Sequence, residues 1–136
     1  MSDDLLRKLN MLVNDHRFNE GTARAYLESN GKCVYCGVDL LKDISTFYSA
    51  DIDHLLPKSK YPELESNIDN WVLSCRACNS IKGKMNIADL SWTPEKAVKE
   101  HKKELIKIIS DHLAEKKINK ETELKIIREI VQGVSI

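Results

Sequence analysis

Four cysteines, arranged as two Cys-x-x-Cys pairs, constrain the fold of this 136-residue chain more than any other feature. The pairs are Cys33/Cys36 and Cys75/Cys78, and the whole segment 37–74 lies between them. Each pair has the spacing of a tight turn, and four thiolates together satisfy tetrahedral Zn²⁺ completely. The sequence therefore predicts a structural zinc site with four cysteine ligands. Two redox dithiols and an iron site are the alternatives.

The length and composition favour a small domain that needs such a metal. The middle of the chain is poor in large apolar residues, and a small core of that kind usually depends on a metal or on disulfides. We expect a single domain over residues 1–136, made of a helical N-terminal segment (1–30), a metal-binding core (31–90) and a C-terminal helical extension (91–136).

The N-terminus and the hydropathy of the chain predict its compartment. Met1 to Asp4 is acidic and does not resemble a signal peptide. The chain has no apolar run of the ~20 residues that a membrane-spanning helix needs. We therefore expect a soluble, cytoplasmic protein, in which reduced thiols bind metal more often than they form disulfides.

Apolar periodicity predicts helices at both ends of the chain. An apolar stripe indicates a helix over 3–16, and a shorter helix over 22–28 should end at Asn30-Gly31. Thr93-Pro94 starts another helix, and Asn119 should cap a last one that ends near Gly133. The stripes of these two C-terminal helices are expected to face the core or a partner; they are formed by Val98, Leu105, Ile108, Ile109 and Leu113, and by Leu124, Ile127, Ile130 and Val131.

The segment between these helices is turn-rich. Two short strands are expected over 51–55 and 71–74, joined by the polar loop 57–70. The pattern becomes helical from Arg76 to about Lys84, and 85–92 is a connector. The fold class is thus α+β, a ββα-metal core between helical extensions.

Polar residues with catalytic potential lie between and beside the cysteines. Neutral His54 can take a proton from water near pH 7. Asp53 and the Asn79 side chain offer oxygen ligands suited to Mg²⁺ or Mn²⁺. Lys82 follows Asn79 by three residues, so both lie on one helix face, where Lys82 is expected to hold a phosphate oxygen.

The strand itself raises a geometric problem for the Asp53-His54 pair. Successive side chains on a regular strand point to opposite faces, so Asp53 and His54 need a bend to face one substrate. Asp51 shares the face of Asp53 and is the reserve metal ligand.

Residues 33–83 resemble the HNH (ββα-metal) endonuclease family. The matching motifs are Cys33-x-x-Cys36, Asp53-His54-x-x-Pro57, Asn67 and Asn70 in the loop, and Cys75-x-x-Cys78-Asn79-x-x-Lys82-Gly83. Asn79 stands where many members carry a third His, as in the HNH domain of RNA-guided CRISPR nucleases.

The resemblance implies a role for each matching residue. His54 would be the general base, Asn70 would position it, and Asp53 with Asn79 would bind one catalytic ion, Mg²⁺ or Mn²⁺. The implied reaction is hydrolysis of DNA to 5′-phosphate and 3′-hydroxyl ends, and the strand is expected to bend at Asp53-His54.

The remaining basic and aromatic residues carry weaker predictions. Arg76, Lys84 and Lys58, together with Lys82, are candidate nucleic-acid contacts, although each fits an ordinary solvated charge equally well. Three further histidines are expected to have no catalytic role, and the two tryptophans are expected in the core: His16, His101 and His112; Trp71 and Trp92.

Two classes of function fit the sequence. The first is an HNH-type DNA endonuclease, directed to its target by a partner protein or by dimerisation through the C-terminal helices. The second is a zinc-stapled module that binds nucleic acid or protein without cutting. A zinc deaminase needs His-x-Glu and Pro-Cys-x-x-Cys. It is excluded because no His is followed two residues later by Glu, and Ser74 precedes Cys75.

Overall fold

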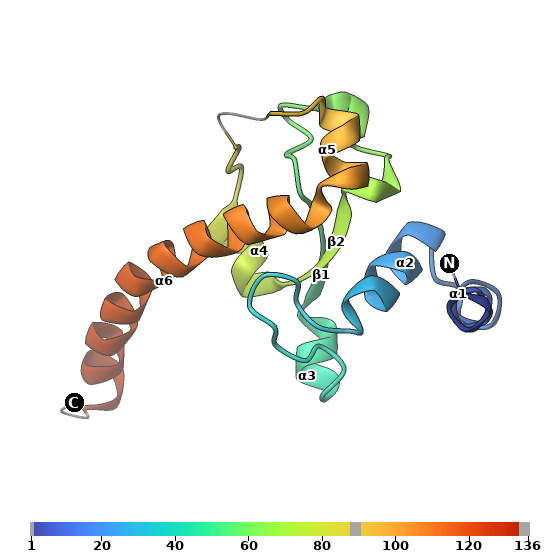
Figure 1. Ribbon diagram of the computed structural model, residues 1–136. Helices are drawn as coiled ribbons and strands as arrows, with labels where there is room; N and C mark the ends of the chain where they lie inside the picture. The colour runs from blue at the N-terminus through green and yellow to red at the C-terminus, as the bar shows by residue number, and fades with distance from the viewer. Residues whose placement is uncertain (1, 88–90, 134–136) are drawn as a thin grey trace.

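The computed structural model describes residues 2–87 and 91–133. An antiparallel pair of strands, β1 (Ala50–His54) and β2 (Trp71–Cys75), lies at the centre with helices around it (Figure 1). The register pairs Ala50 with Cys75 at one end of the ladder and His54 with Trp71 at the other. The cysteines and the Asp53-His54 pair are therefore at opposite ends of one hairpin. The α+β class is confirmed.

Two helices form the N-terminal extension, as predicted. α1 (Asp3–His16) is capped by the Ser2 hydroxyl, and α2 (Glu20–Ser29) by the Asn19 side chain. α2 packs against β2 at Gly21, where a Cβ would lie 2.5 Å from the Trp71 ring. Glycine is therefore needed at position 21 for this close approach.

Three short helices interrupt the region that the sequence describes as turns. α3 (Ile44–Tyr48) begins at Asp43, whose carboxylate and Thr46 form a capping box. The loop between the strands contains two 3₁₀ turns, η1 (Pro62–Leu64) and η2 (Ile68–Asn70). The sequence analysis missed all three, because helices this short carry no apolar periodicity.

The ββα unit ends in α4 (Arg76–Lys82), which follows β2 directly. Cys75 is its N-cap and accepts the N–H of Cys78 through sulfur, at 3.4 Å. Gly83 ends the helix with a φ of +54°, a conformation that other residues rarely adopt. The predicted connector 85–92 falls partly on residues 88–90, outside the described part of the chain.

The C-terminal extension differs from the prediction at its break. α5 (Pro94–Glu100) is followed by α6 (Lys102–Gln132), which continues through Asn119. The predicted cap at Asn119 is wrong, because no Pro or Gly nearby stops the helix and helix propagation is cooperative. The break lies instead at His101, whose ring stacks on Trp92 with centroids 3.8 Å apart.

The core lies between the hairpin, α5 and the first half of α6. Its buried residues include Leu40, Leu55, Leu56, Leu73, Val98, Leu105, Ile109 and Leu113. Ile108 is exposed, so of the two predicted places for this stripe, the core or a partner surface, the core does not apply to Ile108. The second half of α6 runs away from the rest of the molecule (Figure 1), so its stripe Leu124, Ile127, Ile130 and Val131 is exposed.

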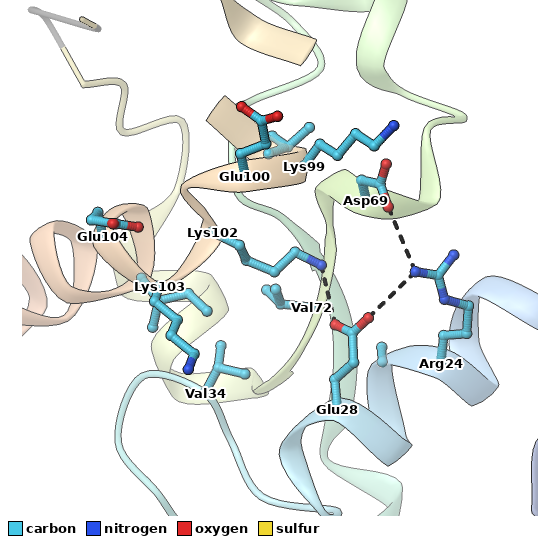
Figure 2. Close-up of a pocket in the computed structure, with 13 residues that line it drawn as sticks. Arg24, Glu28, Val34, Asp69, Val72, Lys99, Glu100, Lys102, Lys103 and Glu104 are labelled. Carbon is cyan, nitrogen blue, oxygen red and sulfur yellow. Dashed lines mark hydrogen bonds and ion pairs between the residues drawn. The ribbon is translucent and has the colours of Figure 1, made fainter. Parts of the chain in front are cut away.

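One ion pair joins α6 to α2 in a groove of about 640 Å³, and Arg24 of α2 makes two more pairs beside it (Figure 2). The Lys102 ammonium lies 3.1 Å from the Glu28 carboxylate, and the Arg24 guanidinium lies 3.6 Å from both Glu28 and Asp69. These four charges pair with one another, which is the pattern of a packing contact. Among the described residues, no helix is long and apolar enough to cross a membrane.

Candidate functional site

The four cysteines converge on one point. The first pair closes a tight turn, since Gly37 donates its N–H to the Cys33 carbonyl and has a φ of +80°. Val34 donates to the Leu73 carbonyl, which brings this turn against β2 and the second pair. The four Sγ atoms lie within 4.8 Å of one another, and Cys36 and Cys75 are 3.8 Å apart.

The sulfur positions and their protonation behaviour fit a zinc ion. A Zn–S bond of about 2.3 Å sets neighbouring sulfurs of a tetrahedron about 3.8 Å apart. Burial and the charges of neighbouring thiolates raise the pKa of the Cys36 and Cys78 thiols. Neighbouring thiolates therefore repel one another until a cation neutralises them. The cluster suits structural zinc, as the cysteine spacing predicts.

The Asp53 carboxylate is buried and held by two side chains. Its exposed fraction is 6%. The Tyr35 hydroxyl donates to Oδ2 at 2.6 Å, and the Lys82 ammonium lies 3.3 Å from the same oxygen. Burial and the Asp53 charge raise the Tyr35 pKa well above its usual value, so Tyr35 stays a neutral donor.

Sequence reasoning missed Tyr35. It is the third residue of Cys33-Val-Tyr-Cys36, eighteen positions from Asp53. The sequence shows only that a Tyr lies inside a metal-binding turn, and this does not reveal that its hydroxyl donates to Asp53. Tyr35 links the zinc cluster to the Asp53-His54 pair.

Lys82, predicted from the sequence to hold a phosphate oxygen, is a buried residue. Only 2% of the residue is exposed. Besides contacting Asp53, its ammonium donates to the His54 carbonyl at 2.9 Å. A buried ammonium needs a carboxylate partner, and Asp53 supplies one. This arrangement fits a residue that holds the Asp53-His54 backbone rather than a phosphate.

The His54 ring is oriented by the loop between the strands. Its Nε2 lies 2.9 Å from the Glu65 carbonyl oxygen, which also accepts the Trp71 indole N–H at 2.9 Å. A carbonyl oxygen can only accept, so Nε2 carries a proton, and in the neutral ring Nδ1 is then the nitrogen with the lone pair. Trp71 is half-buried beside His54, with their rings edge to face at 6.1 Å, so it lies at the site rather than in the core.

Asn70 joins the loop to the chain just after β1. Its side chain accepts the Leu56 N–H at 2.9 Å and donates to the Leu56 carbonyl at 3.0 Å, and it is fully buried. Asn67 accepts the Asp69 N–H and starts η2. Asn70 therefore fixes the segment that follows His54, while Asn67 shapes the turn.

Asn79 lies on the face of β1 that carries the aspartates. Its amide nitrogen is 3.4 Å from an Asp51 carboxylate oxygen, and the other Asp51 oxygen is 3.4 Å from the Arg76 guanidinium. The carboxylate that Asn79 contacts is thus Asp51, the reserve ligand, and not Asp53. The strands pair one-to-one through His54, so the ladder has no bulge at Asp53-His54, and the bend expected there stays a prediction.

Asp53, His54 and Asn79 line one hollow of about 240 Å³. Lys58 and Lys84 also border it, and both are exposed. Arg76 is exposed beyond Asp51, outside that lining. Of the other histidines, His16 is exposed on α1, and half-buried His101 packs on Trp92, which borders the core as predicted. The hollow thus brings together an imidazole, a carboxylate and a carboxamide, with positive charge at its border.

Comparison with known proteins identifies the family of this segment. Residues 33–85 match the family model "HNH endonuclease". The chain is also similar to the Septu protein PtuB of Bacillus thuringiensis, with 46% identity over 55 residues. That match covers 40% of this chain and 20% of the relative, so the chain matches about a fifth of that protein's length. No solved structure matches the chain significantly. Residues 33–85 therefore form a domain of the HNH endonuclease family.

Proposed function

We propose that this protein is a metal-dependent DNA endonuclease with His54 as its general base. The observation that supports this most strongly is the bond between His54 Nε2 and the Glu65 carbonyl. It fixes the tautomer that leaves Nδ1 free to take a proton. A binding module without catalysis would have no need of a His54 ring held with Nε2 protonated next to the Asp53 carboxylate, which Tyr35 and Lys82 hold in place.

Asp53 and Asn79 are the proposed ligands of the catalytic ion, Mg²⁺ or Mn²⁺. Asp53 Oδ2 is engaged by Tyr35, whereas Oδ1 has only a 3.5 Å contact with Lys82 and keeps room for a cation. Asn79 offers its amide oxygen, because its nitrogen points to Asp51. Asp51 remains the reserve ligand. The donor set is all oxygen, which suits these hard cations.

The reaction proposed is in-line hydrolysis of a phosphodiester. His54 Nδ1 accepts a proton from water, the water oxygen attacks phosphorus, and the bond from phosphorus to the 3′ oxygen breaks. The leaving 3′ oxygen takes a proton from solvent water, so the products carry 5′-phosphate and 3′-hydroxyl ends. The bound divalent ion would stabilise negative charge on the phosphate and on the leaving oxygen.

Other residues are assigned supporting roles in this proposal. Asn70 holds the segment after His54, and Lys82 holds Asp53 and the His54 carbonyl. The exposed cations Lys58, Lys84 and Arg76 are proposed to contact backbone phosphates of DNA.

Plasmid cleavage with added Mg²⁺ or Mn²⁺ tests the proposal. We expect wild-type protein to cut, and His54→Ala to cut at least about 100-fold more slowly because general-base catalysis contributes 10²–10⁴-fold. His16→Ala, a change at an exposed histidine on α1, is the matched control and should cut like wild type. Zinc content is measured in all three proteins. Cutting that survives in His54→Ala would exclude His54 as the base.

We further propose that the exposed stripe of α6 binds a partner protein or a second copy of the chain. Ile130 and Val131 are 77% and 75% exposed, which is unusual for apolar residues on one helix face. Such binding would bring the nuclease to its target. Size-exclusion chromatography with static light scattering tests dimerisation. A strict monomer that cuts DNA at defined sequences would contradict both forms of this proposal.

A further inference from the structure

Two neighbouring lysines of α6 lie against α4, near the zinc cluster. The Lys117 ammonium is 3.1 Å from the Cys78 sulfur, and the Lys116 ammonium is 3.4 Å from the Ile81 carbonyl oxygen. They follow Leu113, the last buried residue of α6, by one turn. Lys117 is thus 39 positions away in sequence from the sulfur that it contacts.

The sulfur of Cys78 differs from that of Cys75 in its hydrogen-bond donor. Cys75 accepts a backbone N–H from Cys78, within the same Cys-x-x-Cys turn. Cys78 instead accepts a hydrogen bond from a charged side chain, Lys117 of α6.

A positively charged hydrogen-bond donor beside the Cys78 sulfur is favourable because the zinc centre carries negative charge. Four thiolates around one Zn²⁺ leave a net charge of about −2 in a partly buried centre. The Lys117 ammonium, 3.1 Å from the Cys78 sulfur, offsets part of that charge.

We propose that Lys117 is a positioning residue of the zinc centre, whose ammonium holds the Cys78 thiolate and slows loss of the metal. The contact also connects α6 to the residue next to Asn79 in the chain. This inference rests on the four-cysteine zinc assignment and not on the proposed nuclease activity, so it stands even where no cleavage is found.

Zinc affinity is the direct test. Lys117→Met keeps the aliphatic stem but removes the charge and the donor; we expect zinc affinity to fall by about 10- to 100-fold, as for other residues that support metal ligands. Lys117→Arg should retain most of the affinity. Lys116→Met is the matched control, since it removes the neighbouring contact to a carbonyl rather than to sulfur, and should bind zinc like wild type. Affinity is measured by competition with a chromogenic chelator.

A spectroscopic readout separates this role from a general loss of stability. In the Co²⁺-substituted protein, the thiolate-to-metal absorption band should shift in Lys117→Met and stay unchanged in Lys116→Met. Lys117→Gln serves the same comparison if Lys117→Met does not fold. Equal zinc affinity and identical Co²⁺ spectra in the Lys117 and Lys116 variants would overturn the proposal.

Discussion

The zinc cluster and the Asp53-His54 pair occupy opposite ends of the same hairpin but are assembled from different parts of the chain. The cluster uses residues within two four-residue turns, and its sulfurs converge wherever the turns meet. The Asp53-His54 pair depends on distant groups: Tyr35, the Glu65 carbonyl and Lys82. The four-cysteine end of the hairpin is therefore built from local motifs, whereas the surroundings of the Asp53-His54 pair are produced by tertiary packing.

Through Tyr35 and α4, the geometry of the Asp53-His54 pair depends on the four-cysteine cluster. Tyr35 belongs to the first zinc turn and donates to Asp53. Cys75 caps α4, which carries both Asn79 and Lys82. A change at the zinc cluster should therefore spread to the Asp53-His54 pair, while a change at Asp53 should leave zinc bound. Three predictions test this asymmetry.

The largest effect is expected from removal of zinc. Binding of a structural zinc contributes on the order of 10 kcal/mol, comparable with the whole stability of a small domain. We expect a strong chelator to abolish the cooperative thermal transition and to change the tryptophan fluorescence of the chain, and added Zn²⁺ to restore both. Circular dichroism and fluorescence follow these changes. A melting curve unaffected by complete zinc removal would show that the cluster does not support the fold.

Lys82→Met should give a smaller but still large loss of stability. It leaves the Asp53 carboxylate buried without its cation, and breaking such a pair costs about 3–5 kcal/mol. Urea unfolding without added Mg²⁺ measures this, and zinc content should stay at one ion per chain. Lys84→Met, at an exposed position two residues on, is the control and should change stability little. Equal stabilities of the two variants would show that Lys82 is not the buried ion-pair partner of Asp53.

Tyr35→Phe should have the smallest effect of the three. It removes one hydrogen bond to a charged group, which contributes roughly 1.5–3 kcal/mol, and keeps the ring in place. Zinc affinity should be unchanged, because the hydroxyl does not contact sulfur. Cleavage, if present, should slow as Asp53 loses its orientation. A loss of zinc affinity equal to that of a cysteine variant would mean that the two ends are not separable.

The sequence by itself determined the zinc cluster, the hairpin, the helical ends and the identity of the candidate residues. These features depend on local spacing: Cys-x-x-Cys turns, short apolar strands, caps and 3.6-residue periodicity. The HNH resemblance over 33–83 also agrees closely with the matched range 33–85. Local signals failed at the end of α5 and at Asn119, where helix propagation and the stacking of His101 on Trp92 decided the boundary.

Only the tertiary structure decided which groups surround those residues. Tyr35 on Asp53, the Glu65 carbonyl on His54 and Lys117 on Cys78 join positions that are 11 to 39 residues apart. It also placed Lys82, expected at a phosphate, in the interior against Asp53 and the His54 carbonyl. The physical reason is that a hydrogen bond or a buried ion pair depends on distances set by packing of the whole chain, while the sequence pattern fixes only neighbours along one turn or strand.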